Sequence, residues 1–208
     1  MKGVNKMRWI CCRRCVFIGI LGKKVKKLRI CSKKPLNLKK LCYNANGRRI
    51  RKEGGWRAMN TVFDVANWFL NKEPMTHKKL QKLCYYAQAW SLALKDKPIM
   101  DSDFEAWVHG PVSRTLYNHY AGSGMMDLVP DAPAKNFTSS EQEILESVWE
   151  TYGEYTGNAL EVLTHSEPPW KNARMMCNPG ERCTNIISRK DMKDYYRSIY
   201  IGQGDAEA

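Results

Sequence analysis

The chain has 208 residues, with 34 Lys or Arg against 21 Asp or Glu and a formal net charge of +13 at pH 7. Its length favours one domain of ordinary size with room for a substantial core. A charge of this magnitude is typical of proteins that bind nucleic acid or an anionic membrane, but here it is unevenly distributed.

The basic charge is concentrated in residues 1–58, which hold 19 Lys or Arg and one acid, Glu53. Residues 59–208 hold 15 Lys or Arg and 20 Asp or Glu, so this part of the chain is mildly acidic. An acidic domain repels phosphate, which argues against nucleic-acid binding by this part, although a local basic face remains compatible with the charge. No stretch reaches the roughly 18–20 apolar residues of a membrane span, so no membrane partner is expected.

Residues 1–58 allow two interpretations. They can be a basic arm, a targeting segment or a zinc site, because apolar residues 15–21 follow two arginines and because Cys12 and Cys15 form a C-x-x-C pair. Lysines follow the apolar run directly, however, and no second tight cysteine pair is present. We favour a disordered leader or translated upstream sequence with Met59 as the natural start, because charge and cysteine content change abruptly there.

The remaining cysteines argue for a reducing environment. Five of the eight cysteines lie in the leader, and the body contains Cys84, Cys177 and Cys183. Three cysteines in about 150 residues do not make a disulfide framework, so a cytoplasmic location is expected.

Helical periodicity dominates residues 59–201, and a polar, flexible tail is expected over 202–208. Asn60 and Thr61 can cap a first helix that ends at Pro74, and Thr76 can open a second that stops before Pro98. The second helix has one apolar stripe, and its lysines are expected on another face. These lysines are Lys78, Lys79 and Lys82.

Residues 103–109 alternate between two faces and predict a short strand. Gly110-Pro111 is expected to end it, with Pro111 in the first turn of a helix that runs to about Tyr120. Residues 121–138 form the longest loop.

Two capping boxes are predicted in the remaining chain, Ser140 with Glu143 and Ser188 with Asp191. A helix over about 158–164 is expected between them. The sequence therefore predicts a mainly α, compact single-domain fold of six or seven helices with one or two short β-strands.

The candidates for polar chemistry are His109, His119, His165 and Glu167. No G-x-S-x-G, H-E-x-x-H or P-loop motif is present, so neither catalysis nor a cofactor is expected. His165 and Glu167 bracket a proline-rich turn and can bind a metal, but one His and one carboxylate make an incomplete ligand set. We therefore expect His165 to cap the preceding helix and Glu167 to accept backbone hydrogen bonds at the turn.

Aromatic side chains are numerous between residues 85 and 120, and aromatic residues are enriched at protein interfaces. Most are expected in the core, with one or two at a partner surface. Trp107 is the first choice, since it lies on the strand face opposite Phe104 and Ala106. An open edge of this strand can also accept a partner strand.

Five ordered blocks, VANWFLNK, MTHKKLQKLCYYAQAW, FEAWVHGPVSRTLY, LTHSEPPWKNAR and ISRKDMKDYY, span about residues 60–200. Together they resemble the Panacea domain of SocA-like, phage-associated antitoxins. The resemblance implies a cytoplasmic bacterial or prophage protein, the antitoxin of a type II-like toxin–antitoxin pair, whose domain covers residues 59–201. The segment 175–185 departs from the compact connection that the resemblance leads us to expect.

By that resemblance the partner is a cognate toxin from a neighbouring gene, bound directly, with no small-molecule substrate. One alternative is an adaptor that delivers the toxin to a cytoplasmic protease. Another is a phage accessory protein with weak nucleic-acid binding through the leader. The predicted partner-binding residues are Lys79, Lys82, Tyr85, Tyr86, Trp107, His109, Gly110, Pro111, His165, Glu167 and Trp170.

Overall fold

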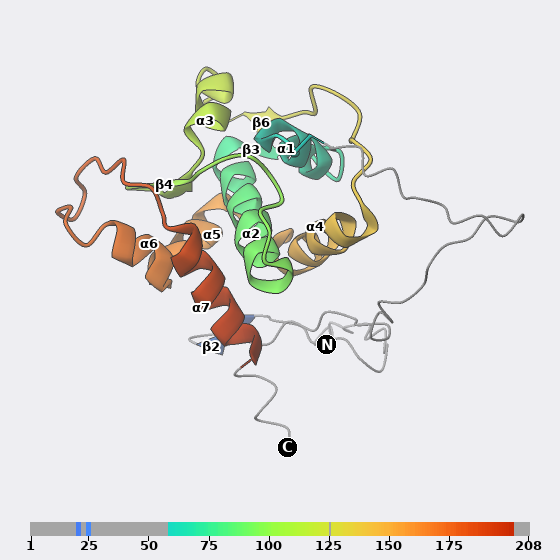
Figure 1. Ribbon diagram of the computed structural model, residues 1–208. Coiled ribbons are helices and arrows are strands. Elements are labelled where there is room, and N and C mark those ends of the chain that lie inside the picture. Colours follow the sequence, from blue (N-terminus) through green and yellow to red (C-terminus); the bar gives the residue numbers. More distant parts are fainter. Residues whose placement is uncertain (1–19, 22–23, 26–57, 125, 202–208) are drawn as a thin grey trace, which may run out of the picture. The chain divides into compact units, whose positions relative to one another are not determined.

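A computed structural model describes residues 20–21, 24–25, 58–124 and 126–201 (Figure 1). The chain divides into two units, Met1–Arg57 and Ala58–Ala208. In the first unit, the described residues form an antiparallel pair of strands, β1 (Ile20–Leu21) and β2 (Lys24–Val25). The predictions for zinc ligation, targeting and start position in the leader, and for the tail, lie outside the described residues.

The second unit is mainly α, as predicted. Its described residues form α1 (Val62–Leu70), α2 (His77–Lys95), α3 (Arg114–Tyr120), α4 (Ser139–Tyr152), α5 (Gly157–Ser166), α6 (Pro168–Ala173) and α7 (Arg189–Ile201). Its strands are β3 (Met75–Thr76), β4 (Glu105–Trp107), β5 (Gly110–Val112) and β6 (Asp127–Leu128). β3 pairs with β6 and β4 pairs with β5, both antiparallel. Among the described residues, no helix combines the length and apolarity that crossing a membrane requires.

Helix α2 is the centre of the unit, with α1, α4, α5 and α7 packed around it (Figure 1). Its N-cap is Thr76, as predicted, and its C-cap is Asp96, which has a positive φ of 57°. Every residue from Leu80 to Ala93 is buried. The prediction that Lys82 lies on a face away from the apolar stripe is therefore wrong. Neighbouring elements surround the helix there, so this position has no solvent-facing side.

The β4–β5 hairpin differs from the prediction that a helix starts at Pro111. Residues Gly110–Val112 instead form β5, and α3 begins at Arg114 after the cap residue Ser113. Gly110 allows this reversal because its φ is +92°, a conformation that L side chains rarely adopt.

The suggestion that β4 has an open edge for a partner strand is also wrong. The Ala106 amide donates to the Asn185 carbonyl at 2.8 Å, and the Ile187 amide donates to the Phe104 carbonyl at 2.8 Å. The segment before α7 thus occupies the edge that β5 leaves free, and strand addition there would have to displace it.

The first predicted capping box is displaced by two residues. Thr138 is the N-cap of α4, and Glu141 completes the box, because the Thr138 and Glu141 side chains each bond the other's backbone amide. Near the start of α7, the Asp191 amide donates to the Ser188 hydroxyl at 3.3 Å, which is one of the two bonds of the second predicted box. The proline-rich turn continues into α6, since proline suits the first turn of a helix.

Replacing Thr138 with alanine is expected to lower the free energy of unfolding by about 1 kcal/mol, because the hydroxyl that accepts the Glu141 amide is lost. Urea unfolding measures the change. Ser139→Ala, in the adjacent first position of α4, is the control and should stay within about 0.5 kcal/mol of wild type. Equal effects of both substitutions would contradict the assignment of the cap.

Candidate partner-binding site

The eleven residues predicted to touch a partner separate by burial. The buried members are Lys82, Tyr85, Tyr86, Gly110, Pro111 and Glu167. The members with exposed surface are Lys79, Trp107, His109, His165 and Trp170. Among these, the His109 side chain is 73% exposed, whereas Lys79 pairs with Glu73 and is largely covered. Contact with a partner stays a prediction, and the geometry favours it for Trp107 and His109.

Lys82 supports the hairpin from inside the protein. Its Nζ donates to the Pro111 carbonyl at 3.0 Å and lies against Gly110. Burial lowers the pKa of Lys82 to about 7, although the nearby Glu161 carboxylate opposes the shift. Lys82 therefore links α2 to β5 and does not reach the surface in this conformation.

Glu167 connects the junction of α5 and α6 to α2 and α7 through two tyrosine hydroxyl groups. Tyr86 of α2 donates to its Oε1 at 3.3 Å and Tyr196 of α7 donates to its Oε2 at 2.6 Å, at the junction of α5 and α6. Burial raises the pKa of Glu167 to about 8, against the lowering by the two hydrogen bonds. The expected bonds to backbone donors at the turn are replaced by bonds to these tyrosines, whose separation along the chain conceals them in the sequence.

His165 stacks on Trp170 with ring centres 4.0 Å apart and planes at 18°. Trp170 in turn donates its Nε1–H to the Trp107 carbonyl at 3.0 Å, which ties α6 to the hairpin. Burial lowers the pKa of His165, and its Nε2 has no hydrogen-bond partner in the described part of the chain. No group of three His, Cys, Asp or Glu that could hold a metal occurs among the described residues.

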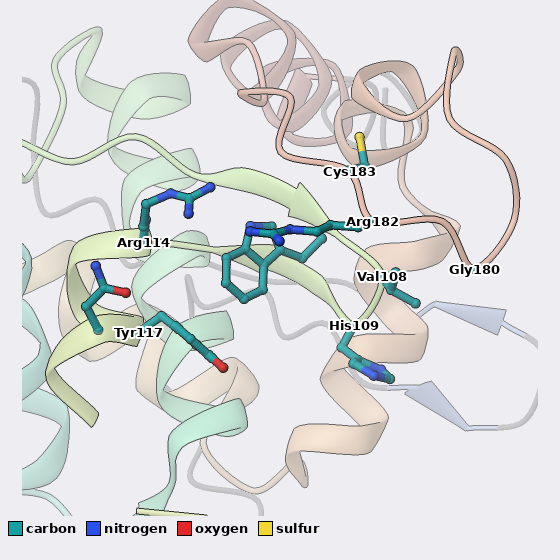
Figure 2. A pocket seen from close by; sticks show the side chains of 9 residues that line it. Val108, His109, Arg114, Tyr117, Gly180, Arg182 and Cys183 are labelled. Atoms are coloured by element: carbon teal, nitrogen blue, oxygen red, sulfur yellow. The ribbon is translucent and has the colours of Figure 1, made fainter. Parts of the chain in front are cut away.

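Two of the candidates with exposed surface, Trp107 and His109, line an open cleft of about 640 Å³ between the hairpin turn, the start of α3 and the loop before α7 (Figure 2). It is lined by Trp107, Val108, His109, Arg114, Tyr117, Asn118, Gly180, Arg182 and Cys183. In Figure 2 the Arg182 side chain extends from the loop toward the side of the cleft that Arg114 and Tyr117 occupy.

Glu105 holds the aromatic wall of this cleft in place. Its carboxylate accepts the Trp107 Nε1–H at 2.8 Å and two Arg114 N–H groups at 2.7 Å each. The Arg114 guanidinium lies 5.7 Å from the Trp107 ring centre, and Tyr117 meets Trp107 edge-on at 4.7 Å. The wall is thus preorganised by hydrogen bonds, an ion pair and ring contacts.

The lining carries basic side chains and no carboxylate. Arg182 is exposed and makes no ion pair with any described residue, whereas His109 Nδ1 lies 3.0 Å from Glu161. Because residues 59–208 are acidic in total, this lining is a local exception that favours an anionic or hydrogen-bond-accepting ligand.

Arg174 fixes the loop that completes the cleft. This buried side chain donates to the Ala106 carbonyl at 2.7 Å and to the Glu181 carbonyl at 2.8 Å. The sequence marked segment 175–185 as unusual but did not predict Arg114, Arg182 or Cys183 as site residues. They come from separate segments without shared periodicity, and tertiary bonds such as those from Ala106 to Asn185 and from Arg174 to Ala106 bring the loop to the hairpin.

Comparisons with known proteins agree with the resemblance in the sequence. Residues 80–171 match the family model for "Antitoxin SocA-like, Panacea domain". Antitoxin SocA of Caulobacter vibrioides (strain NA1000 / CB15N) is 31% identical over 171 residues, which cover 68% of this chain and 88% of that protein. No solved structure matches the chain significantly. The chain therefore belongs to the SocA-like antitoxin family with a Panacea domain.

Proposed function

We propose that this protein is an antitoxin that neutralises a toxin, encoded by a neighbouring gene, through direct protein–protein binding in the cytoplasm. The role is non-enzymatic and needs no cofactor. The family relation supports an antitoxin role, and the cleft beside the hairpin is the observation that carries the binding mechanism.

The composition of the cleft resembles that of binding hot spots. Trp, Tyr and Arg dominate such positions, and the lining contains Trp107, Tyr117, Arg114 and Arg182. The buried members of the predicted set then act as the scaffold: Lys82, for example, holds the hairpin that presents Trp107. The toxin is expected to place an acidic segment in the cleft, because the lining carries no carboxylate.

Co-expression with each neighbouring reading frame tests the proposal. A neighbour that stops growth alone and permits growth beside this protein supports it. The absence of any toxic neighbour would sink the idea. A second chain that starts at Met59 separates the roles: equal rescue places neutralisation in the Panacea domain, whereas loss of rescue would favour the alternative in which the basic leader binds nucleic acid.

Trp107→Ala and Arg182→Glu are each expected to weaken toxin binding about ten-fold or more, equivalent to about 1.4 kcal/mol. The first removes the aromatic wall, and the second reverses the unpaired charge. Titration calorimetry of the purified proteins gives the affinities. Lys97→Glu is the matched control, because Lys97 is exposed in the loop after α2, outside the cleft lining. Equal weakening by the control would mean that only total charge matters.

A further inference from the structure

The loop before α7 carries two cysteines, Cys177 and Cys183, and both are free thiols. Their sulfur atoms approach the same polar pair at the end of α6. Asn185 Nδ2 donates to the Ala173 carbonyl at 2.9 Å and contacts Cys177 Sγ at 3.7 Å, while Cys183 Sγ contacts that carbonyl at 3.9 Å. A hydrogen bond with Cys183 also raises the pKa of Cys177. The two thiols are therefore neighbours, although five residues separate them.

Their surroundings differ from those of Cys84. Cys84 is fully buried in the core, where burial raises the pKa of its thiol well above the usual range. Cys177 is half-buried, and Cys183 lines the cleft. The described residues supply no third His, Cys, Asp or Glu ligand for a metal beside the pair. Two adjacent thiols, the half-buried Cys177 and the buried Cys183, remain available for dithiol–disulfide chemistry.

We propose that Cys177 and Cys183 form a reversible disulfide, with a low-molecular-weight disulfide as the oxidant. The Cys177 thiol loses its proton to solvent, and its thiolate attacks one sulfur of the oxidant, forms a mixed disulfide and releases one thiolate, which takes up a proton. The Cys183 thiol gives its proton to solvent, attacks the Cys177 sulfur and releases the second thiolate. Two electrons pass from the protein to the oxidant, which leaves as two thiols.

The bond would close a small ring over the wall of the cleft. Residues 178–182 lie between the cysteines, and Gly180 and Arg182 in this segment line the cleft. Arg174 already holds the segment through the Asn178 and Glu181 carbonyls. Oxidation therefore restricts the backbone that carries Arg182, and cytoplasmic disulfides of this kind are typically transient sensors.

Tryptic mapping of the full-length protein tests the bond. Trypsin cleaves after Arg174, Arg182 and Arg189, so the two cysteines fall in separate peptides, residues 175–182 and 183–189. After treatment with oxidised glutathione and alkylation of free thiols, we expect these two peptides to be linked and to separate on reduction. Cys84→Ala should keep the linked pair, whereas Cys183→Ser should leave glutathione on Cys177.

The inference is overturned if both peptides are recovered alkylated, if glutathione stays on Cys177 of the wild type, or if either cysteine pairs with a leader cysteine instead. The mapping needs no toxin, so its result stands apart from the proposed function. The effect on binding rests on that function: the oxidised and reduced proteins should differ at least three-fold in toxin affinity, with no difference in Cys177→Ser. Linked peptides with unchanged affinity would refute the coupling to the cleft, and failure of both forms to bind would refute the proposed function alone.

Discussion

Replacing Gly110 with alanine is expected to lower the free energy of unfolding by about 3 kcal/mol. Two effects add at this position. The φ of +92° is strained for any L side chain, and a Cβ would lie 2.8 Å from Lys82 Cε and 2.9 Å from Thr164 Oγ1. Since Lys82 is fully buried, it cannot move away without losing its bond to Pro111. Urea unfolding of the variant and wild type measures the difference.

Gly124→Ala is the matched control. Gly124 also has a positive φ, +58°, but no atom lies within 4 Å of its added Cβ. It should therefore report the backbone strain alone, about 1 kcal/mol. If the two variants lose the same stability, the close approach of Lys82 to Gly110 has no energetic role.

The second large effect is a pH dependence from Glu167. Its pKa rises from 4.5 to about 8 in the folded protein, so between these values the native state holds a proton that the unfolded chain has lost. Its contribution to stability is therefore fully present below pH 4.5 and is lost as the pH rises through 8. Glu167→Gln keeps the shape, accepts from one tyrosine through its oxygen and donates to the other hydroxyl through its amide NH2, but it has no proton to lose.

We expect the difference in unfolding free energy between Glu167→Gln and wild type to shift by about 3 kcal/mol in favour of the variant from pH 5 to pH 8. Taking this difference cancels titrations common to both proteins, including that of Lys82. Tyr196→Phe, which removes the shorter bond to Glu167, is a second test and should raise the carboxyl pKa further. A difference that does not change with pH would show that Glu167 is ionised in the folded state.

Local signals predicted much of the fold. Thr76 and one of the two cap candidates of the first helix, Thr61, are the caps in the structure, because a hydroxyl before an apolar period satisfies free amides at a helix start. The apolar period of α2 predicted a helix, but not that the helix is central. The burial of Lys82 depends on α5 and β5, which lie far away in the sequence. The bonds of Glu167 to Tyr86 and Tyr196 also join residues that are distant in the sequence, so local patterns do not predict them.

The candidate site was predictable only in part. The alternation along β4 placed Trp107 on the face opposite the core, and it lines the cleft in the structure. Arg182 could not be predicted, because its position depends on tertiary bonds that Arg174 makes to β4 and to its own loop. The prediction of a helix from Pro111 is wrong for a similar reason. The chain continues from Gly110 into β5, because the position of Pro111 in the ladder requires no backbone N–H.

The most direct test of the central claim is the amount and state of the toxin in rescued cells. Both direct neutralisation and delivery to a protease restore growth, so growth alone does not separate them. We predict that the toxin remains at its unrescued level and purifies in a stable complex with this protein, and that Trp107→Ala and Arg182→Glu reduce the amount of complex and the rescue together. Restored growth with loss of the toxin, and recovery of the toxin when the cytoplasmic protease is inactivated, would contradict neutralisation by binding alone.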